Sequence, residues 1–145
     1  MKKILTIILF CILTIGMASI ASAAEWRYVA PDMDNNQFFF DIQSFEKVSD
    51  TIYTVWIKQE YSEANKKEMS EGSPDYYGYP VTYSLYQYVF DFHNKKARVA
   101  AFENYDKDNN IVHANKLNTQ WDNITPNNLG SDIFTATYDY YKKHY

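Results

Sequence analysis

The 145-residue sequence is poor in cysteine, glycine and proline, with one, four and four of these residues. Its single cysteine, Cys11, lies in an apolar run near the N-terminus. The rest of the chain can therefore form no internal disulfide and offers no thiol for catalysis. A domain without cross-links must be stabilised by its core. A chain of this length can bury on the order of two-thirds of its unfolded surface, which makes such a core feasible.

The sequence also lacks the motifs that mark enzymes and cofactor-binding proteins. It contains no phosphate-binding glycine loop and no Gly-x-Ser-x-Gly nucleophile motif. Its histidines, His93, His113 and His144, are far apart and belong to no metal-ligand motif. We therefore predict a protein that is not an enzyme, with no catalytic residues, no cofactor and no metal site.

An excess of basic residues is absent as well. The chain has 14 Lys and Arg against 18 Asp and Glu, a formal net charge of −4. A nucleic-acid-binding protein needs a basic face that neutralises phosphates. The charge balance therefore predicts no nucleic-acid partner.

Asp106, Asp108 and Asn110 have the spacing of a calcium-binding loop. The sixth loop position holds Ile111 where glycine is needed, and the twelfth holds Leu117 where a bidentate glutamate belongs. A tight hairpin turn explains the same residues, and we predict such a turn here.

The N-terminal residues have the pattern of a secretory signal peptide. Lys2 and Lys3 precede an apolar run over residues 4–15, and small residues lead up to Ala23. We predict cleavage after Ala23, which gives a signal peptide at 1–23 and one domain at 24–145 without a transmembrane span. The alternative is an uncleaved anchor, since no further charge precedes Glu25. Cys11 follows bulky Phe10, which disfavours lipid attachment.

Aromatic residues are abundant, with 14 Tyr, 9 Phe and 3 Trp. They are densest in residues 83–92, whose composition predicts a central strand of a sheet. Large side chains fall on both parities of this stretch. The pattern indicates either a bulge near residues 85 and 86 or a strand covered on both faces.

Further strands are predicted at 26–30, 38–42, 52–61, 98–105 and 111–116. Within 52–61, one parity collects side chains expected to face the core: Tyr53, Val55, Ile57 and Tyr61. The other parity carries Thr54, Trp56, Lys58 and Glu60.

Two helices are predicted. Ser62 could cap a short helix at 63–70. Asn127 or Asn128 could cap a C-terminal helix. We expect Trp121, together with the helix face of Ile133, Phe134 and Tyr138, to pack on the sheet.

Two clusters are candidate protein-binding sites. Tyr76, Tyr77 and Tyr79 form either an exposed anchor patch for a protein or glycan, or a lid folded back over the sheet. A dense basic cluster consists of Lys95, Lys96 and Arg98. This cluster is either a solvated corner or a binding surface.

Three groups of residues resemble the surface-adhesin protein E family in order and spacing. The first comprises Phe38-Phe39-Phe40-Asp41, Ser44-Phe45 and Val55-Trp56-Ile57-Lys58; the second is the hairpin 105–112; the third is Trp121-Asp122-Asn123-Ile124-Thr125-Pro126 before a terminal helix. The resemblance implies an α+β fold, a single antiparallel sheet of about six strands with a C-terminal helix packed on it.

The resemblance also implies an exported surface or envelope protein that binds host matrix proteins or plasminogen. The alternative is a periplasmic structural or sensing module without a host ligand, and a homodimer is compatible with either. In many members a cysteine stands at the position of Phe92, and the terminal helix carries another. Their absence implies that ring packing replaces a disulfide in this chain.

Overall fold

The computed structural model describes residues 23–72 and 80–145. These residues form an open antiparallel sheet with two helices, which confirms the predicted α+β class. The predicted signal peptide, all but its last residue, and the cluster of Tyr76, Tyr77 and Tyr79 lie outside the described residues.

The main strands of the sheet are β1 (Trp26–Pro31), β2 (Gln37–Asp41), β4 (Ile52–Glu60), β5 (Tyr83–Asp91), β6 (Lys96–Tyr105) and β7 (Ile111–Lys116). They pair in the order β1-β2-β4-β5-β6-β7. Two short strands lie beside this path: β3 (Glu46–Lys47) pairs with β4, and β8 (Asp122–Asn123) pairs with β6. The five strands predicted around residues 83–92 all exist, with ends shifted by at most two residues.

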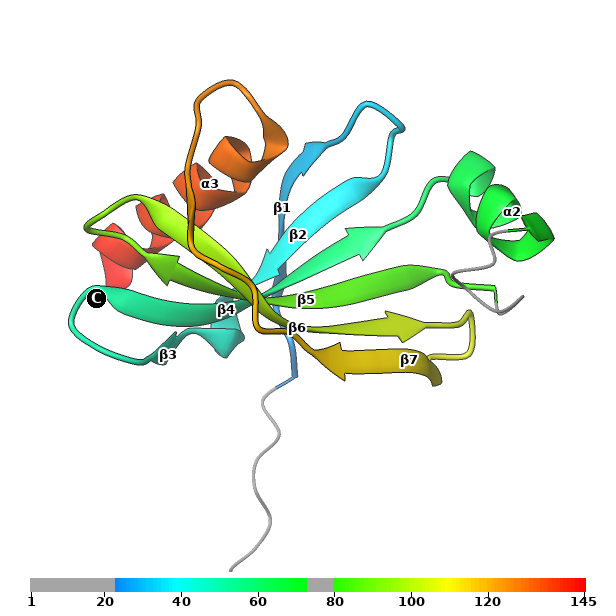
Figure 1. The fold of residues 1–145 in the computed structure, drawn as a ribbon, viewed down its shortest axis with the longest axis horizontal. Helices are drawn as coiled ribbons and strands as arrows, with labels where there is room; N and C mark the ends of the chain where they lie inside the picture. Colours follow the sequence, from blue (N-terminus) through cyan, green and yellow to red (C-terminus); the bar gives the residue numbers. More distant parts are fainter. Residues whose placement is uncertain (1–22, 73–79) are drawn as a thin grey trace, which may run out of the picture.

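The two helices are α2 (Glu63–Gly72) and α3 (Leu129–His144). Figure 1 shows them at opposite ends of the sheet. Asn128 is the N-cap of α3, because its side chain accepts a hydrogen bond from the backbone N–H of Ser131. Ser62 Oγ accepts one from the backbone N–H of Asn65 at 3.3 Å, as expected for the start of α2.

One face of the sheet carries α3 and the main core. Val55 and Ile57 of β4 are fully buried, and Ile133 and Phe134 of α3 pack against the same cluster. The predicted packing of the terminal helix is therefore confirmed. The prediction for Trp121 is wrong: its side chain is 40% exposed, and the guanidinium of Arg98 lies over its ring.

The strand predicted at 83–92 is β5, with two neighbours, β4 and β6. The register with β6 shifts between Gln87, opposite Ala101, and Tyr88, opposite Val99. The extra residue is therefore Ala100 on β6. Of the two alternatives given for residues 83–92, the bulge near residues 85 and 86 is not found on β5; the bulge lies on the neighbouring strand.

Phe92, directly after β5, is 4% exposed and joins the sheet to α3 through its ring. Its ring centroid lies 5.7 Å from that of Phe134, 5.6 Å from that of Tyr138 and 4.7 Å from that of Tyr141. These contacts join the end of β5 to α3 through ring packing; that such packing replaces a disulfide stays a prediction.

Candidate binding surface

Strands β4, β5 and β6 align side chains in rows on the face of the sheet opposite α3. Residues paired across antiparallel strands point to the same side of the sheet. The register gives the rows Ile52/Asp91/Lys96, Thr54/Val89/Arg98, Trp56/Gln87/Ala101, Lys58/Leu85/Glu103 and Glu60/Tyr83/Tyr105. We call this surface the open face. No helix of the described residues packs on it, and most of its side chains are half-buried.

On the open face, the ammonium group of Lys58 contacts two aromatic rings and a carboxylate. Its Nζ is 5.0 Å from the ring centroid of Trp26 and 4.8 Å from that of Phe39. The same atom forms an ion pair of 2.7 Å with Glu60. An ammonium held by two rings and a carboxylate keeps these side chains in fixed positions.

Tyr83 and Tyr105 lie side by side in the last row of the open face, next to Glu60. Their rings stack with centroids 4.7 Å apart and an interplanar angle of 6°. The Tyr105 hydroxyl donates a hydrogen bond of 2.5 Å to Glu103. Burial, and after it the hydrogen bond to Glu103, raises the pKa of Tyr105 well above its ordinary value. The hydroxyl therefore remains a donor throughout the physiological range.

A groove runs along this part of the open face. Its volume is about 520 Å³, and Trp26, Lys58, Tyr83, Leu85 and Asp106 are among its lining residues. The predicted turn closes one end: the Asp106 carboxylate accepts hydrogen bonds from the backbone N–H groups of Asp108 and Asn110. The side-chain amide of Asn110 also donates to this carboxylate, and this bond, followed by the backbone bond of Asn110, lowers the pKa of Asp106. A hairpin turn was predicted here, and the structure has one.

The predicted basic cluster divides between a turn and the open face. Lys95 occupies the β5–β6 turn with a φ of 52°, and its carbonyl accepts a hydrogen bond from the backbone N–H of Ile124. Lys96 and Arg98 belong to the rows of the open face. The Arg98 guanidinium lies 5.5 Å from the ring centroid of Trp121. A binding role for the three residues stays a prediction.

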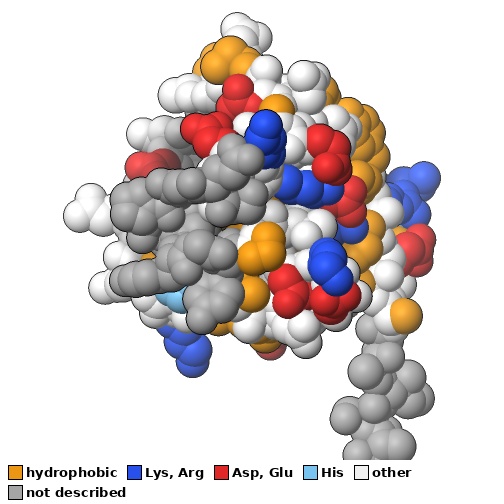
Figure 2. Space-filling view, turned by 90° about the vertical axis from the view of Figure 1, so that its right-hand side faces the viewer, with side chains coloured by type: hydrophobic (Ala, Val, Ile, Leu, Met, Phe, Trp, Pro, Cys, Tyr) orange, Lys and Arg blue, Asp and Glu red, His pale blue; other side chains and the backbone are white. Residues whose placement is uncertain are grey.

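Charges of both signs are mixed on the molecular surface. Figure 2 shows acidic and basic side chains interspersed, with hydrophobic side chains between them. Among the described residues, no group of three or more His, Cys, Asp or Glu side chains is arranged to hold a metal ion. Within residues 23–72 and 80–145, no helix is long and apolar enough to cross a membrane.

The family model for surface-adhesin protein E matches residues 26–137, from the start of β1 into α3. The chain belongs to this family. Searches of the curated proteins and of the solved structures found no significant match. The resemblance inferred from the sequence is thereby confirmed, and the family indicates an exported, surface-adhesin-like protein.

The fold explains two of the residues on which the family resemblance rests. Asp41 is buried and accepts hydrogen bonds from the backbone N–H groups of Glu25 and Gln43. Ser44 Oγ accepts one from the backbone N–H of Trp56. These two residues hold the ends of strands together. The functional candidates in the adhesin-like motifs are those on the open face, Phe39, Trp56 and Lys58.

The alternation in residues 52–61 predicts that Trp56, Lys58 and Glu60 share one side of a strand, but it does not mark them as site residues. The signal for them in the sequence is that aromatic and charged residues occur together at the alternate positions expected to face away from the core. Tyr83, Glu103 and Tyr105 gave no comparable signal. Their association depends on the register between β5 and β6.

Proposed function

We propose that the chain is an exported, non-enzymatic binding module whose open face contacts a protein partner. The partner class is a host extracellular matrix protein or plasminogen. The observation that carries the proposal is the series of aligned rows with Trp56, Lys58, Tyr83 and Arg98 on a sheet face that no described helix covers.

The composition of the open face supports a protein partner. Trp, Tyr and Arg are enriched in protein interfaces and in binding hot spots. The rings of Trp and Tyr bury large areas at low entropic cost, because each side chain has only two torsion angles. Trp56 and Tyr83 are half-buried, so their backbones are fixed while part of each ring faces solvent. Such preorganised rings lose little conformational freedom on binding.

The charge pattern supports specificity rather than general adhesion. Lys96 and Arg98 lie with Asp91 at one end of the open face, and Glu60 and Glu103 lie with Lys58 toward the other. A partner with the complementary order of charges binds in one orientation and associates faster than an uncharged one. The groove of about 520 Å³ at the Glu60 end is within the usual size range of binding clefts.

The experiment measures retention of the purified protein on immobilised laminin, vitronectin and plasminogen, with albumin as the negative surface. We expect saturable binding to at least one of the three. Trp56→Ala should weaken that binding by about tenfold or more, the effect of removing a hot-spot tryptophan. Arg98→Ala provides a second test that leaves the β4 packing intact.

The matched control is Met33→Ala, because Met33 is fully exposed in the β1–β2 turn, away from the rows. This variant should bind like the unmodified protein. No retention on any of the three proteins would contradict the host-ligand proposal. Equal binding by Trp56→Ala, Arg98→Ala and Met33→Ala would show that the open face is not the contact surface.

Protease treatment of intact cells separates the proposal from a periplasmic envelope module. A surface-exposed protein is degraded when protease is added outside the cell. Complete protection in intact cells, with degradation after permeabilisation, would contradict the host-binding role and favour an envelope partner.

A further inference from the structure

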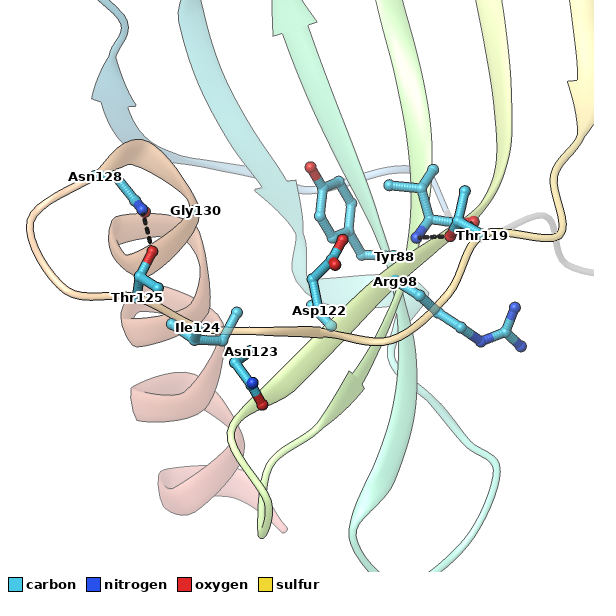
Figure 3. A pocket seen from close by; sticks show the side chains of 11 residues that line it. Tyr88, Arg98, Thr119, Asp122, Asn123, Ile124, Thr125, Asn128 and Gly130 are labelled. Carbon is cyan, nitrogen blue, oxygen red and sulfur yellow. Dashed lines mark hydrogen bonds between the residues drawn. The ribbon is translucent and has the colours of Figure 1, made fainter.

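A separate hollow lies on the side of the sheet that carries α3. It is bounded by β6, by the segment 119–128 and by the start of α3 (Figure 3). We call it the helix-side pocket. Its volume is about 250 Å³. Pockets for small-molecule ligands usually have about 300–1,000 Å³. The helix-side pocket is therefore better matched to a single amino-acid side chain.

The walls of the helix-side pocket are fixed by hydrogen bonds before any ligand binds. Thr119 Oγ1 accepts a bond from the backbone N–H of Val99 and donates one to its carbonyl, at 3.0 and 2.7 Å. The backbone N–H of Ile124 donates to the carbonyl of Lys95 at 3.0 Å. These bonds attach the 119–128 segment to β6, so that Ala97, Val99 and Ile124 form a preformed apolar lining.

Asp122 supplies the charge of the helix-side pocket. It pairs with Ala97 in the β6–β8 register, which places both side chains on the side of the sheet that carries Tyr88. Figure 3 shows the Asp122 side chain directed toward the Tyr88 ring. Among the described residues, Asp122 forms no ion pair.

Arg98 is also a lining residue of the helix-side pocket, but its guanidinium lies over the Trp121 ring. Arg98 follows Ala97 in β6 and therefore lies on the opposite face, where its guanidinium covers the Trp121 ring. Figure 3 shows its side chain directed away from the Tyr88 ring. The carboxylate of Asp122 is therefore left to attract a cation from outside the chain.

The remaining polar groups of the helix-side pocket are either occupied or neutral. The Asn128 side chain caps α3 and donates to Thr125 Oγ1 at 2.7 Å. The Tyr88 hydroxyl is uncharged at neutral pH, and burial raises its pKa further above the ordinary value. The electrostatic character of the pocket therefore comes from Asp122 and from the electron-rich face of the Tyr88 ring.

We infer that the helix-side pocket binds the side chain of a lysine or arginine presented by another protein. The aliphatic stem would lie against Val99, Ala97 and Ile124, as long basic side chains do on apolar surfaces. The charged head would meet the Asp122 carboxylate and the ring of Tyr88. The net charge of −4 favours the approach of such a basic group. This site lies on the opposite side of the sheet from the open face, shares only Arg98 with it, and does not depend on the proposed function.

The test titrates the isotope-labelled protein with blocked amino acids and follows amide chemical shifts. The probes are the Nα-acetyl N-methylamides of lysine, arginine and norleucine. Norleucine has the lysine stem without the ammonium group. We expect lysine or arginine to shift the amides of Tyr88, Val99, Asp122 and Ile124, and to bind about fivefold more tightly than norleucine.

Asp122→Asn keeps the shape of the side chain and removes its charge. It should abolish the preference for lysine or arginine over norleucine while leaving the melting temperature unchanged. The matched control, Asp139→Asn, makes the same change of net charge on α3, outside the pocket lining, and should keep the preference. Asp122→Glu should retain part of it.

Three outcomes would overturn the inference: shifts confined to other parts of the molecule, equal binding of norleucine, and an unaltered preference in Asp122→Asn. None of these outcomes depends on whether matrix proteins are retained. A result that contradicts ligand binding in the helix-side pocket can therefore be told apart from a result that contradicts protein binding by the open face.

Discussion

Individual tyrosines on the open face combine burial with hydrogen bonding. Tyr105 stacks on Tyr83 and donates to Glu103, and burial, followed by this hydrogen bond, raises the pKa of its hydroxyl. Tyr83 also has a raised pKa, chiefly from burial and then from the neighbouring charge of Asp106. At the residue scale, the open face is therefore a set of fixed neutral rings beside fixed charges.

The stability of the fold should fall as the pH rises above about 10, the ordinary pKa of tyrosine. Below that pH both the folded and the unfolded chain keep the Tyr105 proton. Above it the unfolded chain loses the proton first, because the folded-state pKa is raised. Urea unfolding at a series of alkaline pH values measures this decline.

Tyr105→Phe has no proton to lose at this position and should show a shallower decline than the unmodified protein. Its stability at neutral pH should be lower, because Glu103 loses its hydrogen-bond donor. Identical slopes for the two proteins between about pH 10 and pH 12 would contradict the assigned role of Tyr105.

At the scale of elements, α2 depends on one buried asparagine outside the helix. Asn36 Oδ1 accepts hydrogen bonds from the backbone N–H of Ser62 and from the side chain of Asn65, at 2.9 and 3.0 Å. Asn36 is 3% exposed and is itself held by Asp32. The β1–β2 turn and the start of α2 are therefore one hydrogen-bonded unit.

Asn36→Ala should destabilise the protein by about 1–3 kcal/mol, because buried polar partners lose their bonds. Amide hydrogen exchange should accelerate at the start of α2 more than in β5. Asn65→Ala is the control, since it removes one of these bonds and leaves the backbone bond of Ser62. If both variants had equally small effects, the fixation of α2 by Asn36 would be refuted.

Over the whole molecule, aromatic packing joins the sheet to α3. Phe92 contacts Tyr53 and Phe90 of the sheet and three rings of α3. Edge and offset contacts between rings add to the stabilisation from area burial. The arrangement needs no oxidising step during folding.

Phe92→Ala should cost about 3–5 kcal/mol of unfolding free energy, since it removes a buried ring and leaves a cavity. Chemical denaturation gives this difference. Phe92→Leu should cost clearly less, because it fills part of the same volume. A nearly neutral Phe92→Ala would mean that the sheet and α3 do not depend on this ring.

The fold was predictable because the signals for it are local. Alternation in residues 52–61 and the cap before α3 depend on neighbours in sequence, and both predictions were confirmed. Trp121 was misassigned because a large apolar ring is usually buried, whereas here the cation of Arg98 covers it at the surface. The candidate site depends on register, which brings Trp56 beside Gln87 and Lys58 beside Leu85. The sequence contains no local signal for such pairs.

The most direct test of the open face is oxidative labelling of side chains with and without the partner that retains the protein. Trp56, Tyr83 and Tyr105 should be labelled more slowly in the complex. Tyr138 of α3, on the other side of the sheet, should be labelled at the same rate in both states. Protection of Tyr138 with unchanged labelling of Trp56 and Tyr83 would contradict the assignment of the open face as the binding surface.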